Sequence, residues 1–304
     1  MKNIMILGSE GYVGSALSQY LKNKYNTIGV DLCWFGKYQK DVINKDFSQL
    51  DEKYFDVIDA VILLAGHSST KMCVGNWTSA FFNNVSNFVS LLEKIRQNKT
   101  KLIFASSSSV YGNTFGEIAD EDRPQKNSLN EYDASKIMLE HAALQEKEIE
   151  WYGLRFGTVN GFSPNFRSEL MINSMYTNAK STSKINVTNS SINRSILGIS
   201  DLCLAIDAIL QKGSVNLSGF YNVSSFNSTV DEISNVISEM TNSEIIYNED
   251  LPNPYDFRTS NVKFETSFDF KFTDTISSIV EDIERKYNCI QKIGDRNTAL
   301  HYRS

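Results

Sequence analysis

The stretch Asn3-Ile-Met-Ile-Leu-Gly8-Ser-Glu-Gly11-Tyr-Val-Gly14 opens with an apolar run that stops at a glycine, and apolar residues then recur at helical spacing over residues 13–21. This pattern is typical of a buried parallel strand followed by a tight turn and a helix. Gly8 allows the turn, Gly11 lets the backbone approach a ligand, and the helix N-terminus presents free N–H groups to an anion. The stretch therefore predicts a βαβ unit that binds a dinucleotide pyrophosphate at its first turn.

A second apolar run, Thr27-Ile-Gly-Val-Asp31, ends in a carboxylate about 20 residues after the glycines, where a fold of this kind holds the adenosine ribose. An acid at this place accepts hydrogen bonds from the ribose diol and repels a 2′-phosphate. Asp31 therefore favours NAD over NADP as the cofactor.

The overall composition is that of a globular protein. The 304 residues carry a net charge of −6 and a pI near 5.3, which give no reason to expect a nucleic-acid or anionic-membrane partner. No apolar stretch reaches the roughly 18 to 20 residues of a membrane span, and no signal-peptide layout precedes the first strand, so we expect a cytoplasmic protein. The four cysteines are far apart and only three histidines could join them, so we expect no metal site.

Short apolar runs alternate with amphipathic runs through the first half of the chain. This alternation predicts an α/β fold with a doubly wound parallel sheet of the Rossmann type. Ser128-Leu-Asn-Glu131 fits a capping box at the start of one predicted helix. The expected strands are 3–7, 27–31, 60–65, 101–105 and 152–156, and the expected helices are 13–24, 78–97 and 132–147.

After about residue 160 this pattern loosens, and no clean linker marks a second unit. The expected elements there are a loop and helix in 162–184, helices at 199–211, 230–240 and 276–286, and a short strand at 219–223. We therefore expect a smaller C-terminal substrate lobe that is interwoven with the first domain. In this division residues 1–161 form the NAD-binding Rossmann domain, 194–226 return to it, and 162–193 and 227–304 form the lobe.

The segment Asn130-Glu-Tyr132-Asp-Ala-Ser-Lys136 places a phenol and an ammonium four residues apart on a predicted helix, so both groups share one face. A nearby ammonium favours phenolate, and we expect it to lower the Tyr132 pKa from its usual value of about 10. With a serine hydroxyl close by, this is the layout of an acid/base site that oxidises a hydroxyl group.

Four groups of small or polar residues follow the ends of predicted strands. The carboxyl ends of parallel strands meet at one edge of the sheet, and ligands bind there. We therefore expect these groups to form one site. They are Gly8, Asp31, Ala65-Gly66 and Ser106 to Ser109.

In their order along the chain, these motifs resemble the extended short-chain dehydrogenase/reductase family, in its nucleotide-sugar epimerase and dehydratase branch. The resemblance covers nearly the whole chain. Each motif alone is weak, whereas several in one order are specific. The motifs are Gly8-x-x-Gly11-x-x-Gly14, Asp31, Asp46-Phe47, Leu64-Ala65-Gly66, Asn83-Asn84-Val85, Ser106-Ser-Ser-Ser-Val-Tyr-Gly112, Tyr132-x-x-x-Lys136, Leu154-Arg155, Thr158-Val-Asn-Gly161, Arg194 to Asp201 and Tyr221-Asn-Val223.

The resemblance implies a role for each matching residue. Tyr132 takes the proton of a sugar hydroxyl, Lys136 lowers the Tyr132 pKa and holds the nicotinamide ribose, and Ser107 polarises the reacting C–O group. The implied NAD-binding residues are Gly8, Gly11, Tyr12, Val13, Gly14, Asp31, Asp46, Phe47, Leu64, Ala65, Gly66, Asn84 and Lys136. The implied substrate-binding residues are Ser107, Ser108, Asn173, Arg194 and Arg258. Relatives pair two long helices across a four-helix bundle, so a homodimer is implied as well.

The serine run helps to choose a reaction. Sugar dehydratases of this family carry an Asp-Glu pair where this chain has Ser108-Ser109, because the elimination of water needs both an acid and a base. Small hydroxyl residues resemble those of epimerases, which oxidise a carbinol and return the hydride to the opposite face of the keto sugar. We therefore expect NAD-dependent epimerisation of a nucleotide-diphospho-sugar, at C4 of a UDP-linked sugar.

Two other functions stay open on the sequence. A reductase of a keto nucleotide sugar would consume NAD(P)H, and a non-catalytic regulatory protein would keep the dinucleotide-binding fold without the chemistry. Departures from the family pattern at Thr158, Asn160 and His67-Ser68 leave the sugar open. His67 is either a hydrogen-bonded loop residue or a second catalytic group beside the nicotinamide.

Overall fold

The apolar runs of the first half, joined by one strand from the second half, form a seven-stranded sheet in which neighbouring strands pair in parallel. The structure, a computed structural model, describes residues 1–37, 39–125, 128–251 and 255–293. The strand order β11-β7-β5-β4-β1-β2-β3 runs outward from β1 in both directions, which confirms the predicted doubly wound fold. The strands are β1 (Asn3–Leu7), β2 (Asn26–Asp31), β3 (Val42–Asn44), β4 (Ala60–Leu63), β5 (Lys101–Ser107), β7 (Trp151–Phe156) and β11 (Gly219–Val223).

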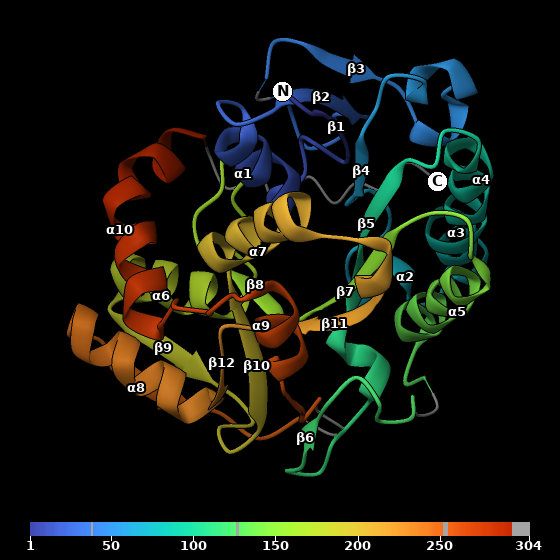
Figure 1. Cartoon of the computed structure of the whole chain (residues 1–304). Coiled ribbons are helices and arrows are strands. Elements are labelled where there is room, and N and C mark those ends of the chain that lie inside the picture. The colour runs from blue at the N-terminus through green and yellow to red at the C-terminus, as the bar shows by residue number, and fades with distance from the viewer. Residues whose placement is uncertain (38, 126–127, 252–254, 294–304) are drawn as a thin grey trace.

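Helices cover both faces of this sheet: α1 (Tyr12–Leu21), α4 (Asn87–Arg96), α5 (Glu131–Gln145), α7 (Ile199–Lys212) and α9 (Val262–Phe268). Figure 1 shows α1 and α7 on one side of the sheet and α4 and α5 on the other. Ile4 and Ile6 of β1 pack in the apolar layer that includes α1 and α7, and Met5 and Leu7 pack in the layer that includes α4 and α5. The two sets separate because successive side chains of a strand point to opposite faces. The strands are thus buried on both sides.

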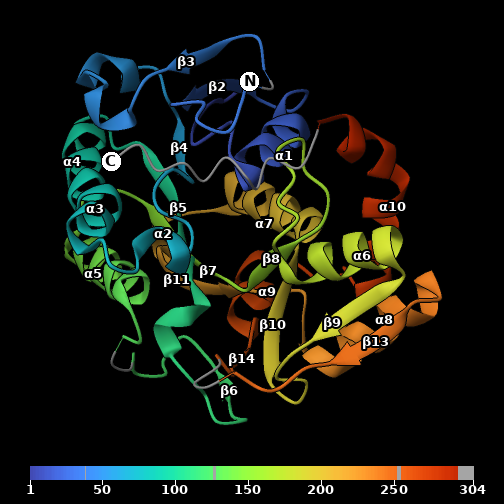
Figure 2. The same ribbon diagram turned by 180° about the vertical axis from the view of Figure 1, so that it is seen from behind.

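A smaller unit has an apolar core of its own. Its elements are β8 (Thr158–Asn160), β9 (Lys184–Val187), β10 (Asn193–Gly198), β12 (Phe226–Thr229), β13 (Glu244–Tyr247), α6 (Met171–Thr182), α8 (Val230–Thr241) and α10 (Ile276–Ile293). Ile172, Ile233 and Val280, from three different helices, are fully buried in this core. Figure 2 shows α6, α8, β9 and β13 gathered beside the large sheet.

The chain passes between the two units more than once. β10 and β12 belong to the small three-stranded sheet. Between them in sequence lie α7, which packs on the large sheet, and β11, which is a strand of it. Phe264 and Phe268 of α9 also pack in the core of the large sheet, although we had expected residues 227–304 to form the lobe. β6 (Ile118–Ala119) and β14 (Arg258–Thr259) make a further parallel pair. The smaller unit is therefore interwoven with the larger one.

The helix expected at 78–97 is wrong as a single element. The structure has α3 (Trp77–Phe81), a π-helical turn η3 (Phe82–Ser86) and then α4. The Asn84 side chain in this turn accepts a hydrogen bond from the His67 N–H at 2.8 Å and donates one to the His67 carbonyl at 3.1 Å. A π turn takes in one more residue than an α turn, and such turns gather at functional sites. The π turn at Phe82–Ser86 holds the loop after β4 in place. Apolar periodicity cannot reveal a contact of this kind.

The capping box expected at Ser128 is also wrong. Helix α5 begins at Glu131, and its N-cap is Asn130, whose side chain accepts a hydrogen bond from the Asp133 N–H at 3.1 Å. The Glu131 carboxylate accepts instead from the Gly75 N–H at 3.1 Å. Asn caps a helix about as well as Ser does. The capping preferences of Ser128 and Asn130 therefore allowed α5 to begin after either residue. The contact between Glu131 and Gly75 favoured the later start.

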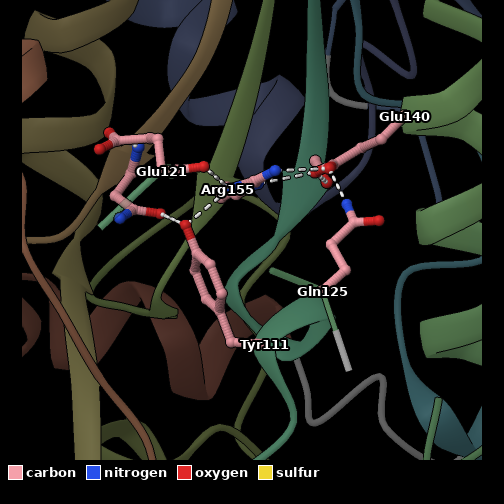
Figure 3. Close-up of polar contacts among 7 residues, drawn as sticks. Tyr111, Glu121, Gln125, Glu140 and Arg155 are labelled. Atoms are coloured by element: carbon pink, nitrogen blue, oxygen red, sulfur yellow. Dashed lines mark hydrogen bonds and ion pairs between the residues drawn. The ribbon is translucent and has the colours of Figure 1, made fainter. Parts of the chain in front are cut away.

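A buried ion pair ties α5 to β7. The Arg155 guanidinium donates to both carboxylate oxygens of Glu140, at 3.0 and 2.8 Å, and the two side chains are 4% and 0% exposed. Figure 3 shows how the Tyr111 hydroxyl, 2.7 Å from Arg155, and the Gln125 amide, which donates to Glu140, complete the network. Burial alone lowers the Arg155 pKa, but the Glu140 carboxylate outweighs this effect and raises it. The network therefore holds α5 at one position on the sheet.

Replacement of Glu140 by Gln should destabilise the fold strongly. It leaves Arg155 buried without a counter-charge, so we expect the free energy of unfolding to fall by about 3–5 kcal/mol. Asp282→Asn breaks partly exposed pairs with Lys286 and Arg285 and is the matched control, with an expected loss of about 1 kcal/mol or less. Urea unfolding followed by circular dichroism measures both losses. Equal losses in the two variants would show that the buried pair has no special weight.

Candidate functional site

A cavity of about 390 Å³ lies at the carboxyl ends of β1, β2 and β4. Open α/β sheets bind their ligands at this edge. Asn84 and Lys136, which we expected to contact the cofactor, do not line this cavity. The other predicted NAD-binding residues do line it, namely Gly8, Gly11, Tyr12, Val13, Gly14, Asp31, Asp46, Phe47, Leu64, Ala65 and Gly66.

The glycines of the first turn serve different purposes. Gly8 has a φ of 90°, and a Cβ at this position would lie 2.6 Å from the Ala65 nitrogen. A Cβ at Gly14 would lie 1.9 Å from the Gly8 carbonyl oxygen, so this glycine lets α1 pack on the turn. A Cβ at Gly11 would meet a single atom within 4 Å, the Gly8 oxygen at 3.3 Å, and Gly11 lines the cavity. The free side of Gly11 therefore fits the close approach of a pyrophosphate.

The Asp31 carboxylate lies at the end of β2 and lines the cavity. One oxygen accepts a hydrogen bond from the Cys33 N–H at 2.6 Å, and the other accepts from the Glu10 N–H at 2.9 Å. Burial raises the Asp31 pKa, and these two hydrogen bonds partly offset that effect. Each carboxylate oxygen has a further lone pair, so Asp31 can accept ribose hydroxyl groups as well. The acceptor oxygens of Asp31, together with the open side of Gly11, thus fit a dinucleotide.

Tyr132, Lys136 and Ser107 converge beside this cavity. The Lys136 ammonium donates to the Ala105 carbonyl oxygen at 2.9 Å and lies 5.8 Å from the centre of the Tyr132 ring. The Ser107 hydroxyl neighbours the Tyr132 phenol and lowers its pKa. Tyr132 also packs against the small cluster of Met72, Cys73 and Ala80, of which Met72 lines the cavity. A phenol, an ammonium and a hydroxyl from α5 and β5 therefore gather next to the cavity, although none of the three is among its lining residues.

The Tyr132 phenol is not ionised in advance by Lys136, contrary to the expectation from their spacing. Burial raises the Tyr132 pKa to about 12, and the neighbouring Ser107 hydroxyl offsets only part of this rise. Burial also lowers the Lys136 pKa to about 8. The spacing brought the two groups together, but the same packing removed water from both and so disfavoured both charged forms. The chain alone keeps the phenol protonated at neutral pH.

The members of the serine run point in different directions. The Ser107 oxygen lies 2.9 Å from the Ser109 oxygen and accepts a hydrogen bond from the Ser109 N–H at 3.2 Å. Ser108 is fully buried, and its hydroxyl donates to the Arg155 carbonyl at 3.2 Å. Ser106 is buried too, and it donates to Glu140. Ser107 and Ser109 are therefore the two partly exposed members on the side of Tyr132.

Asn173 lies beneath the glycine turn and is fully buried. Its side chain accepts a hydrogen bond from the Gly161 N–H at 2.9 Å, and donates to the Arg167 carbonyl at 2.9 Å and the Tyr12 hydroxyl at 3.3 Å. The amide is thus occupied by the chain itself. Its position explains how the loop of residues 161–167 is held against the first turn.

Arg194 and Arg258 are near neighbours of one phenylalanine and are not among the residues that line the cavity. The Arg194 guanidinium lies 6.0 Å from the centre of the Phe257 ring, and Arg258 follows Phe257 in the chain. Burial lowers the Arg194 pKa to about 10, although the charge of Asp256 raises it. Within the described residues, the Arg258 Nε is buried without a hydrogen-bond partner. Desolvated guanidinium groups favour a bound anion.

Sequence reasoning missed Arg167, which lines the cavity. It forms an ion pair with Glu169 at 2.5 Å, and its charge lowers the pKa of both Tyr12 and Tyr132. His67 lies in the same wall, and its Nε2 is 2.8 Å from the Ser79 hydroxyl, as expected for a hydrogen-bonded loop residue. No motif marks Arg167, because the smaller unit brings it to the cavity from the loop before α6.

Several wider features of the described residues bear on the site. Within 1–37, 39–125, 128–251 and 255–293, no three His, Cys, Asp or Glu side chains are arranged to hold a metal ion. In the same ranges no helix has the length and apolar character needed to cross a bilayer. Cys33, Cys73 and Cys203 are free thiols, and the Cys289 side chain lies outside the described part.

Alanine at Gly14 and at Gly11 should separate folding from ligand binding. Gly14→Ala forces a Cβ into the Gly8 carbonyl, so we expect the free energy of unfolding to fall by about 2 kcal/mol or more. Gly11→Ala should cost about 1 kcal/mol or less, yet weaken NAD binding, because its Cβ occupies the space of the pyrophosphate. Thermal unfolding and calorimetric titration with NAD measure the two effects. Full NAD affinity in Gly11→Ala would contradict the proposed cradle.

The chain is similar in sequence to characterised nucleotide-sugar enzymes. It is 27% identical over 173 residues to the UDP-glucose 4-epimerase of Streptococcus mutans, a match that covers 53% of this chain and 51% of that protein. The chain thus spans about half the length of the curated relatives it matches first.

Solved structures share the fold over almost the whole chain. The UDP-glucuronic acid 4-epimerase from Bacillus cereus, in complex with UDP-glucuronic acid and NAD, superposes with a TM-score of 0.82 at 21% identity and covers 96% of this chain and 100% of that chain. The dTDP-glucose 4,6-dehydratase from Bacillus anthracis, in complex with NAD, gives 0.81 at 20% identity, with 97% and 100% covered. At these identities the likeness shows the fold alone.

A family model decides the classification. The model of the NAD dependent epimerase/dehydratase family matches residues 4–224, which include the glycine turn, Asp31, the serine run and the Tyr132 and Lys136 pair. The match spans most of the chain and both halves of the site. The chain therefore belongs to the NAD dependent epimerase/dehydratase family.

Proposed function

We propose that this chain is an NAD-dependent epimerase that acts at C4 of a UDP-linked sugar through a transient keto sugar. The observation that carries the proposal is the meeting of Tyr132, Ser107 and Lys136 beside the cavity that the glycine turn and Asp31 line. NAD is the cofactor of the family. The names of its relatives, which include 4-epimerases of UDP-glucose and UDP-glucuronic acid, support the choice of C4 and of a UDP-linked sugar.

The groups of the chain suit the removal and return of one proton at a sugar hydroxyl. Tyr132 exchanges the proton, and Ser107 holds the same oxygen by a hydrogen bond. The Lys136 ammonium, 5.8 Å from the phenol ring centre, supplies positive charge as the proton moves. NAD, bound at the glycine turn and at Asp31, supplies the hydride acceptor and later the hydride donor.

We assign the diphosphate of the substrate to Arg194 and Arg258. Both guanidinium groups are partly buried, and the Arg258 Nε has no hydrogen-bond partner within the described residues. Arg167, at the cavity, is a third candidate for the same charge. Asn173 and Ser108 support the site indirectly, because their side chains are already bonded to the chain.

Incubation with UDP-sugars, followed by NMR, tests the reaction class. An epimerase converts one sugar into its C4 epimer with no net change in the absorbance of reduced nicotinamide. A reductase would instead consume reduced cofactor in proportion to product. The hydroxyl residues at Ser108-Ser109, where an elimination would need acids, support epimerisation.

Tyr132→Phe should slow turnover strongly while leaving the cofactor bound. Loss of the phenol removes the proton exchange, so we expect kcat to fall by about 10²–10⁴-fold. NAD affinity should change little, because Tyr132 does not line the cavity of the glycine turn. Tyr247→Phe, an exposed phenol on β13, is the matched control and should keep full activity. Equal rates for Tyr132→Phe and the wild type would favour a non-catalytic dinucleotide-binding protein.

We also propose that two copies of the chain associate through α4 and α5. The two helices lie side by side at one edge of the molecule, as Figures 1 and 2 show. They expose Val89 on α4 and Met138 and Leu144 on α5, and Phe82 is exposed in the preceding turn. Apolar side chains that gather on neighbouring surface helices are typical of an interface between subunits.

The double variant Val89→Glu and Leu144→Glu should be monomeric. Two buried carboxylates at an apolar interface are strongly unfavourable, so light scattering should report the mass of one chain, against two for the wild type. Val215→Glu changes a more exposed valine outside these helices and should stay dimeric. A monomeric wild type would rule out the proposed interface.

A further inference from the structure

Trp34 lines the cavity, and yet 63% of this large apolar side chain is exposed. Single apolar residues on a protein surface are common and call for no explanation. Trp34 differs from such a residue because its indole borders a concave site, and such sites hold ligands. The roles assigned above to the glycine turn and to Asp31 do not involve it.

The order of the strands places Trp34 where the base of a dinucleotide would lie. β1, β2 and β3 are successive neighbours in the sheet. Gly11 follows β1 and fits the pyrophosphate, and Asp31 ends β2 and fits the ribose. In NAD the adenine is attached to this ribose, on the side away from the pyrophosphate. Trp34 lies in the connection from β2 to β3 and lines the cavity, so it borders the space beyond the ribose.

Trp34 also has ring surface left to cover. Phe47, which follows β3, lines the same cavity, but its ring is packed in the apolar core of the large sheet. A flat base that enters between the ends of β2 and β3 would therefore find a buried apolar residue in Phe47 and an open aromatic face in Trp34.

A tight turn holds the indole at this position. One Asp31 oxygen accepts a hydrogen bond from the Cys33 N–H at 2.6 Å, and the Gly36 N–H donates to the Cys33 carbonyl at 3.1 Å. Trp34 and Phe35 are thus the central residues of a β-turn. Cys33 has a φ of 55°, in the left-handed region that disfavours a cysteine. Strain of this kind persists where the surrounding contacts over-determine it. The carboxylate that fits the ribose therefore also fixes the turn that carries the indole.

A buried carboxylate in the glycine turn anchors the same connection on its far side. Glu10 is buried, and its two oxygens accept hydrogen bonds from the Gln39 N–H at 3.2 Å and from the Gln39 side-chain amide at 2.8 Å. The Glu10 N–H donates in turn to Asp31 at 2.9 Å. Burial of a charged side chain is costly unless it is hydrogen-bonded. The chain is therefore tied to the glycine turn both before and after Trp34.

We infer that the Trp34 indole stacks on the adenine ring of NAD, and that Asp31 and Glu10 hold the indole in place for this contact. Adenine is flat and aromatic, so it can cover an exposed indole face. The turn is already formed in the chain alone, so little further ordering is needed when the base binds. The contact involves the adenosine half of the cofactor, so it goes beyond the proposed reaction and is independent of the sugar.

Trp34→Leu tests the contact, because leucine keeps an apolar side chain without a flat ring. We expect the Kd of NAD and that of ADP-ribose, which has the adenine but no nicotinamide, each to rise by about tenfold. Trp34→Phe keeps a flat ring and should restore most of the affinity. Trp77→Leu changes a tryptophan on α3 that is 45% exposed and does not line the cavity, so it is the matched control and should bind both ligands normally. Calorimetric titration of protein freed of bound nucleotide measures each Kd.

Tryptophan fluorescence gives a second readout that needs no turnover. The chain has three tryptophans, Trp34, Trp77 and Trp151, and Trp151 is buried in the core of the large sheet. A base stacked on an indole quenches its emission, so saturating ADP-ribose should quench part of the wild-type emission. The quenching should be absent in Trp34→Leu and retained in Trp77→Leu.

Gln39→Ala tests the anchor. It removes the side-chain hydrogen bond to Glu10 and leaves the indole itself unchanged. We expect the Kd of ADP-ribose to rise by about threefold, less than in Trp34→Leu, with the quenching at saturation intact. A wild-type Kd in Gln39→Ala would contradict the role given to Glu10.

Two results would overturn the stacking itself. One is a wild-type Kd for ADP-ribose in Trp34→Leu, and the other is quenching by ADP-ribose that persists in this variant. Neither measurement needs a sugar substrate. A wild-type chain that binds ADP-ribose as expected but converts no nucleotide sugar would overturn the proposed function and support the inference.

Discussion

The buried ion pair between Arg155 and Glu140 is the interaction on which the site depends. Glu140 lies one helical turn after Lys136 on α5, and Arg155 lies on β7, between β5 and the edge strand β11 of the large sheet. The Ser106 hydroxyl, at the end of β5, donates to the same carboxylate. One pair of charges therefore fixes the distance between the helix that carries the phenol and ammonium and the strand that carries the serines. Neither charge can be removed alone without leaving the other unpaired in the interior.

The same burial that positions these groups also sets their chemistry. It raises the Tyr132 pKa and lowers the Lys136 pKa, so proximity alone does not produce a phenolate. Both groups lie on α5, so the packing that brings them next to the cavity also removes water from both.

Local patterns predicted the elements that a local cause determines. The apolar runs at residues 3–7 and 101–105 become β1 and the greater part of β5, and the glycines that follow β1 make the turn. Errors occurred where a distant partner decided the outcome. Asn84 bonds to the His67 backbone within a π turn, and Glu131 bonds to Gly75 rather than closing a capping box. Short strands such as β8 and β12 were not expected, because their pairing partners are remote in sequence.

The sequence by itself determined the α/β class, the family, the NAD-type acid and the pairing of Tyr132 with Lys136, since strand and helix periodicities and i, i+4 spacing are local properties. Tertiary structure alone decided which of the expected site residues face a cavity. It turned Ser108 and Asn173 inward and brought Arg167 to the cavity from the smaller unit. Burial and long-range contacts set side-chain direction and proton affinity, and both arise only when separate segments pack together.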